Sequence, residues 1–165
     1  MNLIKFLKSG IIALVLTFTA TFASAGGHFD ANNHDASMLS EAQLKAMVEE
    51  AMKVNPPKNG KNYVFGFANL QRDIAFCALV EEGILANAEA AGIEILVTDN
   101  LLDGATAMAN AESYITRNVD YVIEFQTDAA FGEMIMNKMN MNGIGVTAID
   151  IPMPGAGFFG ANNPK

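Results

Sequence analysis

From residue 62 to residue 161, short apolar runs alternate with longer segments of helical periodicity. The apolar runs predict strands at residues 62–68, 93–99, 119–125, 144–150 and 157–161. The segments between them predict helices at residues 74–92, 104–118 and 128–143, because their apolar positions recur every three or four residues. Strands that alternate with helices are typical of βαβ units, whose parallel sheet is covered by helices on both faces. Because such crossovers are right-handed, the pattern predicts a doubly wound α/β fold.

An additional amphipathic helix precedes this alternation, at residues 41–54. Ser40 and Gln43 form a predicted capping box at its start. Consecutive prolines and an Asn-Gly pair within residues 55–61 end it. The mature chain therefore divides into a polar tail, helix and linker at residues 26–61 and an α/β lobe at residues 62–165.

The first 25 residues have the pattern of a cleavable secretory signal peptide. Lys5 and Lys8 supply the positive start, residues 11–22 are apolar, and residues 23–25 are the small Ala-Ser-Ala. The alternative is a membrane anchor, but the apolar run is short for a bilayer core, which takes about 20 residues to span. We therefore expect a periplasmic protein.

Cleavage after Ala25 would leave Gly26-Gly27-His28 at the new terminus. A free amine, two amide nitrogens and an imidazole can form a square-planar site of the kind that suits Cu(II) or Ni(II). The simpler interpretation is a polar tail in which the histidine has no metal-binding role, and we predict no functional metal site.

Composition and charge narrow the classes of partner. The chain has 18 acidic and 10 basic residues, a net charge of −8, and no cluster of Lys and Arg that could neutralise phosphates. Nucleic acid is therefore not expected as a partner. The single cysteine, Cys77, excludes an intrachain disulfide, and its apolar helical neighbours indicate a buried, unreactive thiol.

Polar side chains gather where the predicted strands end. In open α/β sheets, ligands bind outside the carboxyl ends of the strands. The residues at these ends offer amides, carboxylates and a guanidinium with fixed hydrogen-bonding directions, which suits a polyhydroxylated ligand. They are Asn69, Gln71, Arg72, Asp73, Asp99, Asn100, Gln126, Thr127, Asp128 and Asp150.

Several of these residues have a structural alternative. Asp73 and Asp128 stand where helices begin, so helix capping would explain them. Asp99 and Asn100 lie in a turn-prone stretch. Asp150 has no such duty, because Pro152 disfavours a capped helix there.

Glu124 is unusual because a carboxylate inside a strand buried on both faces would be costly without a partner. Two interpretations remain open from the sequence. Either Glu124 faces the ligand site, or the end of its strand is more solvated than the apolar pattern indicates.

The sequence lacks the usual signatures of catalysis. Both histidines, His28 and His34, lie in the polar tail, and the segment after the first strand contains no glycine-rich phosphate loop. A nucleophile elbow and a metal-binding pair of histidines or cysteines are also missing from the sequence. We therefore expect a binding protein without enzymatic activity or cofactor. A secreted hydrolase with paired carboxylates is the least favoured alternative.

From residue 62 to about residue 163, the chain resembles the N-terminal lobe of the type I periplasmic sugar-binding proteins of ABC transporters, the ribose-binding-like group. The resemblance rests on the order of several landmarks. A polar loop "ANLQRD" precedes an aromatic helix start, a Gly-closed helix precedes "IEILVTD", "QTDAA" follows the third strand, and Asp150 ends the fourth. The resemblance implies a sheet of order 2-1-3-4-5 and a ligand cleft between two lobes joined by hinge strands.

The resemblance also implies positions for the ligand contacts. By position these are Asn69, Arg72, Asp73, Phe76 and Asp150, to which the strand-end pattern adds Gln126. Phe76 would offer an apolar face to a sugar ring. The chain departs from the family pattern at Ile151, where many members have an arginine, and in a first loop that is a residue or two longer.

The resemblance covers one lobe, and "GFFGANN" resembles the segment by which the family's chain leaves it. We therefore expect a partial chain of a monomeric solute-binding protein that delivers a sugar to a membrane ABC permease or a chemoreceptor. The alternative is a stand-alone single lobe that acts as a periplasmic sensing or interaction module.

Overall fold

The computed structural model describes residues 39–126 and 129–159. The predicted signal peptide, the tail before residue 39, Thr127, Asp128 and the segment after residue 159 lie outside the described residues. All the described elements belong to one compact unit, Ser40–Lys165.

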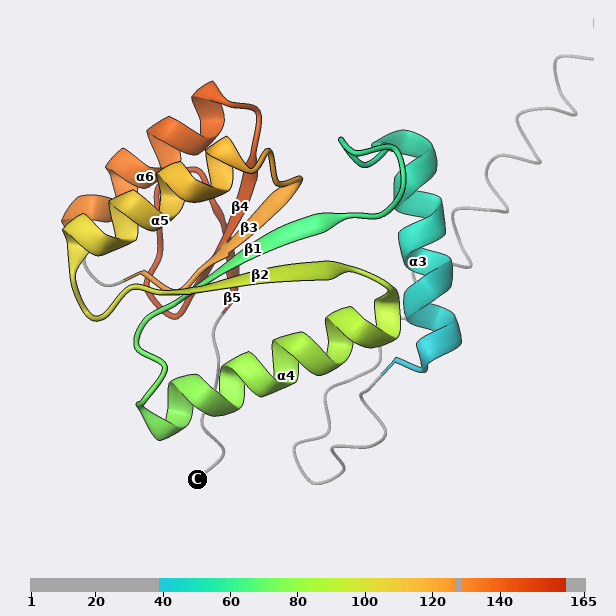
Figure 1. The fold of residues 1–165 in the computed structure, drawn as a ribbon, viewed down its shortest axis with the longest axis horizontal. Helices are drawn as coiled ribbons and strands as arrows, with labels where there is room; N and C mark the ends of the chain where they lie inside the picture. Colours follow the sequence, from blue (N-terminus) through green and yellow to red (C-terminus); the bar gives the residue numbers. More distant parts are fainter. Residues whose placement is uncertain (1–38, 127–128, 160–165) are drawn as a thin grey trace, which may run out of the picture. The chain divides into compact units, whose positions relative to one another are not determined.

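Helices and strands follow one another in the predicted order (Figure 1). The helices are α3 (Glu41–Val54), α4 (Ala75–Ala91), α5 (Gly104–Thr116) and α6 (Ala129–Met141). The strands are β1 (Val64–Asn69), β2 (Glu94–Asp99), β3 (Tyr121–Glu124), β4 (Gly145–Ile149) and β5 (Gly157–Phe159). Each strand lies within a predicted apolar run or overshoots it by one residue, so the α/β prediction is confirmed element by element.

The five strands form one parallel sheet of order β2-β1-β3-β4-β5, as the resemblance implied. Helices α5 and α6 lie on one face of the sheet, and α4 lies on the other (Figure 1). Two apolar clusters fill the layers. One joins α5 and α6 to the sheet around Tyr114 and Val122, and the other joins α4 to it around Phe67 and Cys77. Because the strands are parallel, the carboxyl ends of β1, β2, β3 and β4 meet at one edge of the sheet.

Local signals at the helix ends account for two of the predicted boundaries. The Ser40–Gln43 capping box is present at the start of α3. Gly92 ends α4 with a φ of 73°, a left-handed conformation that glycine adopts without steric cost. Both predictions are confirmed.

The helix α3 packs on α4, although it has no buried residue of its own. Its apolar face, with α4 and the strands, lines a cavity of about 670 Å³. The hydroxyl of Tyr63 also donates a hydrogen bond to the carbonyl of Asn55, just after α3. Within the described residues, no helix is long and apolar enough to cross a membrane.

Candidate functional site

The loop after β1 begins at Asn69, whose side chain is fully buried. Its amide nitrogen donates to the carbonyl of Cys77 at 3.1 Å and to Oε2 of Glu81 at 2.9 Å. Its Oδ1 is buried without a hydrogen-bond partner in the structure. Asn69 therefore fastens the end of β1 to α4, and only its oxygen has unused hydrogen-bonding capacity.

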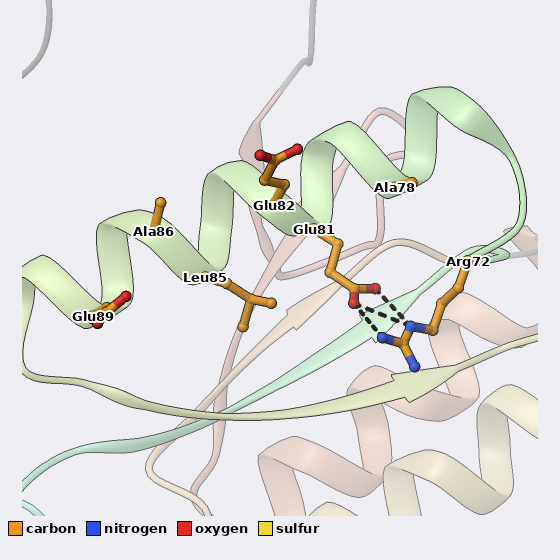
Figure 2. A pocket seen from close by; sticks show the side chains of 7 residues that line it. All are labelled: Arg72, Ala78, Glu81, Glu82, Leu85, Ala86 and Glu89. Atoms are coloured by element: carbon orange, nitrogen blue, oxygen red, sulfur yellow. Dashed lines mark hydrogen bonds and ion pairs between the residues drawn. The ribbon is translucent and has the colours of Figure 1, made fainter.

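Arg72 lies farther along the same loop and is held by Glu81 on α4 (Figure 2). Its Nε donates to both carboxylate oxygens, at 2.9 and 3.1 Å, and its Nη2 donates to Oε1 at 2.5 Å. The hydrogen bond from Arg72 lowers the pKa of Glu81, and the hydrogen bond to Glu81 raises the pKa of Arg72. The two residues form a forked ion pair, in which a planar guanidinium matches a carboxylate.

Asp73 was predicted either to bind ligand or to cap the following helix, and the capping alternative is wrong. The N-cap of α4 is Ile74, which makes no side-chain capping bond. The carboxylate of Asp73 is exposed and accepts a hydrogen bond from the amide of Gln71 at 2.5 Å. Ligand contact by Asp73 remains a prediction that its exposure permits.

Asp99 stabilises the turn after β2, which is the structural role predicted from the sequence as the alternative to ligand binding. Its Oδ1 accepts from the backbone nitrogen of Leu101 at 3.0 Å, and its Oδ2 accepts from that of Arg72 at 3.2 Å. The carboxylate thus ties the loop after β2 to the loop after β1.

Asp150 directly follows β4, in a left-handed conformation with a φ of 56°, and is half-buried. Burial raises the pKa of the Cys77 thiol, and the charges of Asp99, Asp150 and Asp73 raise it further. Asp73 follows β1, Asp99 ends β2 and Asp150 follows β4, so the three carboxylates stand at the same edge of the parallel sheet. Ligand contact by Asp150 stays a prediction.

Gln126 follows β3 and is fully buried. Its amide nitrogen donates to the carbonyls of Ile151 at 3.0 Å and Pro152 at 2.9 Å, so it braces the loop that carries Asp150. Its Oε1 has no hydrogen-bond partner in the structure and lies against Gly132 of α6. A Cβ added to Gly132 would lie only 2.2 Å from this oxygen. Ligand contact by Gln126 stays a prediction.

Phe76 lies at the start of α4 and is half-buried. Its ring meets the ring of Phe125 edge to face, with centroids 6.3 Å apart and an interplanar angle of 82°. Such pairs stabilise each other beyond the area they bury. The pair holds Phe76 at the strand-end edge, with part of its surface exposed.

The solvated alternative for Glu124 is wrong, because its side chain is wholly buried. Its Oε1 accepts from Asn100 at 2.9 Å, and Asn110 on α5 donates in turn to Asn100 at 2.9 Å. Burial raises the pKa of Glu124 to about 8. Burial therefore favours the neutral form of this carboxyl, which lies hydrogen-bonded in the layer between the sheet and α5.

Sequence reasoning missed two residues that shape the site, Glu81 and Asn110. Both lie inside helices, where polar residues are normally exposed. The spacing offered one signal for Glu81, since it stands four residues after the buried Cys77 and therefore on the same face of the helix. The described residues contain no cluster of three or more His, Cys, Asp or Glu side chains that could hold a metal ion.

Comparison with known proteins gives matches to solved structures alone. No protein-family model matches the chain, and no curated protein gives a significant match. A solute-binding protein of an ABC transporter from Mycobacterium smegmatis, solved with bound glycerol, superposes with a TM-score of 0.56 and 20% identity over 59% of this chain and 34% of its own. A solute-binding protein from Bacillus halodurans, solved with bound myo-inositol, superposes with a TM-score of 0.50. The two chains are 25% identical, over 57% of this chain and 33% of the other.

An ABC sugar transporter subunit from Rhodobacter sphaeroides gives a TM-score of 0.54 with 19% identity, over 57% of this chain and 33% of its own. The matched part of this chain therefore covers about a third of the length of each of these three proteins. The lobe described above has the fold of one lobe of the sugar-type solute-binding proteins of ABC transporters.

Proposed function

We propose that this chain is the N-terminal lobe of the solute-binding component of an ABC importer. It binds a sugar or a similar small polyol at the carboxyl ends of the strands, in the periplasm, and passes it to a membrane permease or a chemoreceptor. The proposed contacts are the six predicted from the sequence, Asn69, Arg72, Asp73, Phe76, Gln126 and Asp150.

The observation that carries the proposal is the convergence of polar groups from separate loops. Asp99 at the end of β2 accepts a hydrogen bond at 3.2 Å from the backbone nitrogen of Arg72, in the loop after β1. Gln126 after β3 donates to the carbonyls of Ile151 and Pro152, in the loop that carries Asp150 after β4. Carboxylates accept hydrogen bonds from the hydroxyls of a sugar, and the exposed part of Phe76 can pack against its ring. The solved proteins of the same fold were crystallised with glycerol, myo-inositol and glucose, which supports a polyhydroxylated ligand.

The proposed role is binding without chemistry. Within the described residues, the strand-end loops contain no histidine or exposed cysteine, and Cys77 is buried with a raised thiol pKa. A thiol in that state is a poor nucleophile. The inference is supported by the solved relatives in fold, which are solute-binding proteins.

Titration of the 165-residue chain with D-glucose, D-galactose, L-arabinose and myo-inositol, followed by two-dimensional NMR, tests the proposal. We expect at least one of these solutes to shift resonances of residues 69–76 and 150. Asp150→Asn is the informative variant, because asparagine tolerates the left-handed backbone of this position and the change removes only the charge. Loss of a hydrogen bond to a charged group weakens binding about tenfold or more.

Glu94→Gln is the matched control, since Glu94 is exposed at the amino end of β2, on the opposite edge of the sheet. It removes the same charge and should leave binding unchanged. If no solute in the panel shifts the strand-end resonances, the proposal of a sugar-binding lobe fails. If the total charge of the protein alone mattered, both variants would lose affinity for the solute to the same extent.

A further inference from the structure

Arg72 is the single cationic residue in the segments that follow the first four strands, residues 70–74, 100–103, 125–128 and 150–156. The same edge of the sheet carries Asp73, Asp99 and Asp150. An arginine at such a place would ordinarily recognise an anionic ligand, because its fork matches carboxylates and phosphates. This arginine is therefore the group through which the edge would attract an anionic solute, against the repulsion of its carboxylates.

In the structure, Arg72 is paired with a carboxylate of the same chain. The carboxylate of Glu81 accepts three hydrogen bonds of 2.5 to 3.1 Å from the Nε and Nη2 of Arg72. The side chain of Glu81 is only 10% exposed, whereas that of Arg72 is 53% exposed. Asn69 donates to the Oε2 of Glu81, so the carboxylate is fixed from two sides.

The neighbouring Glu82 shows that the pairing is specific to one position. Figure 2 shows the carboxylate of Glu81 turned down toward Arg72 and that of Glu82 turned away from it, on the outer side of α4. Glu82 is exposed and has no hydrogen bond among those of the described residues. The two glutamates thus carry the same charge on adjacent positions, but only one compensates Arg72.

We propose that Glu81 determines the charge selectivity of the site by neutralising Arg72, so that the site accepts uncharged or amine-bearing sugars and excludes anionic ones such as uronates. This inference rests on the proposed sugar-binding function and narrows its ligand class. Glu81 acts through Arg72 and is a positioning residue rather than a ligand contact. Its role is to prevent the one cation of the edge from recruiting an anion.

The pairing itself can be tested without any ligand. Phenylglyoxal modifies accessible arginines, and the chain has only two, Arg72 and the exposed Arg117. In Glu81→Gln, peptide mass spectrometry should show faster modification of Arg72 relative to Arg117 than in the wild type. Glu82→Gln should leave the ratio unchanged. Equal ratios in wild type and Glu81→Gln would overturn the proposed pairing.

The selectivity is tested with ligand triplets that differ in charge alone, namely D-glucose, D-glucuronate and D-glucosamine, and the matching galactose series. A unit charge several ångströms from the ligand in a partly solvated site changes affinity by roughly three- to tenfold. We therefore expect Glu81→Gln to raise the affinity for the uronate relative to the neutral sugar by that factor. The double variant Arg72→Gln/Glu81→Gln, in which the net charge of the two positions is again zero, should return to the wild-type ratio.

The ratio distinguishes electrostatic selectivity from a merely structural role. A structural defect in Glu81→Gln would weaken all three members of a triplet alike and leave their ratio constant, which would overturn the inference. Wild-type binding of uronate and neutral sugar with equal affinity would do the same, while the sugar-binding function would stand. If no neutral sugar binds in either series, the proposed function fails, and the selectivity inference fails with it.

Discussion

Single residues in this lobe have roles that depend on partners distant in sequence. Glu124 is the clearest case, a carboxyl that is fully buried in β3 and bound by Asn100. The desolvation cost of a buried anion is avoided when the group stays protonated, which is why burial raises its pKa to about 8. Its second oxygen, Oε2, has no hydrogen-bond partner in the structure.

The raised pKa of Glu124 predicts that the protein becomes less stable as the pH rises. The ordinary pKa is 4.5 and the folded value is about 8, so between these values the folded chain binds more protons than the unfolded chain. The free energy of unfolding should therefore fall as pH rises through this window, by at most about 5 kcal/mol, and level off above it. Urea denaturation across the window measures this slope.

Glu124→Gln should flatten the slope, because glutamine is neutral throughout and can still accept from Asn100. The control is Glu133→Gln, an exposed position on α6 where the slope should persist. A slope that survives unchanged in Glu124→Gln would show that another group carries the pH dependence.

At the scale of elements, the close packing of side chains determines how near α5 and α6 lie to each other. The helix α5 begins with Gly104 after an Asp103 cap, whose Oδ1 accepts from the backbone nitrogen of Thr106 at 2.7 Å. A Cβ on Gly104 would lie 2.1 Å from the ring of Phe131 on α6. The two helices that cover one face of the sheet can therefore approach this closely only because the side chain is missing.

Gly104→Ala should destabilise the lobe by about 1–3 kcal/mol, the usual cost of overpacking, because the ring is held between α5 and α6. Gly83→Ala in α4 is the matched control, since nothing lies within 4 Å of its Cβ position. That change should stabilise the helix by about 0.5–1 kcal/mol. Chemical denaturation of both variants gives the comparison, and equal effects would refute the packing argument.

At the scale of the whole molecule, the matched part of this chain corresponds to one lobe and covers about a third of the length of the solved proteins with the same fold. A solute held at the edge of one sheet is contacted from one side. If two lobes together provide about 8 kcal/mol, one lobe provides about half, which corresponds to a dissociation constant near millimolar.

We therefore expect the 165-residue chain to bind its best sugar near the millimolar range, as measured by the concentration dependence of the NMR shifts. The control is a chain unfolded in urea, which should show no saturable shift. Micromolar binding by this chain alone would contradict the one-sided site and favour the stand-alone sensing module.

The sequence alone determined the order and type of every described element. Apolar runs and helical periodicity are local properties, and the glycine at residue 92 and the Ser40–Gln43 pair act within one turn of the helices that they bound. It also placed the candidate site residues at the carboxyl ends of the strands, since the direction of parallel strands follows from the βαβ alternation. The signal peptide and the domain boundary at residue 61 remain predictions.

Only the tertiary structure decided what those residues do. Arg72 and Asp73 stand side by side in the sequence and both are exposed, yet Arg72 pairs with Glu81 nine residues away and Asp73 accepts a hydrogen bond from Gln71. Gln126 was predicted to contact ligand, which stays a prediction, and the structure shows that its amide nitrogen braces the loop after β4. Burial favours the neutral form of Glu124, although the hydrogen bond from Asn100 favours the charged form. Charge compensation and desolvation depend on distances across the fold, and a linear pattern does not contain these distances.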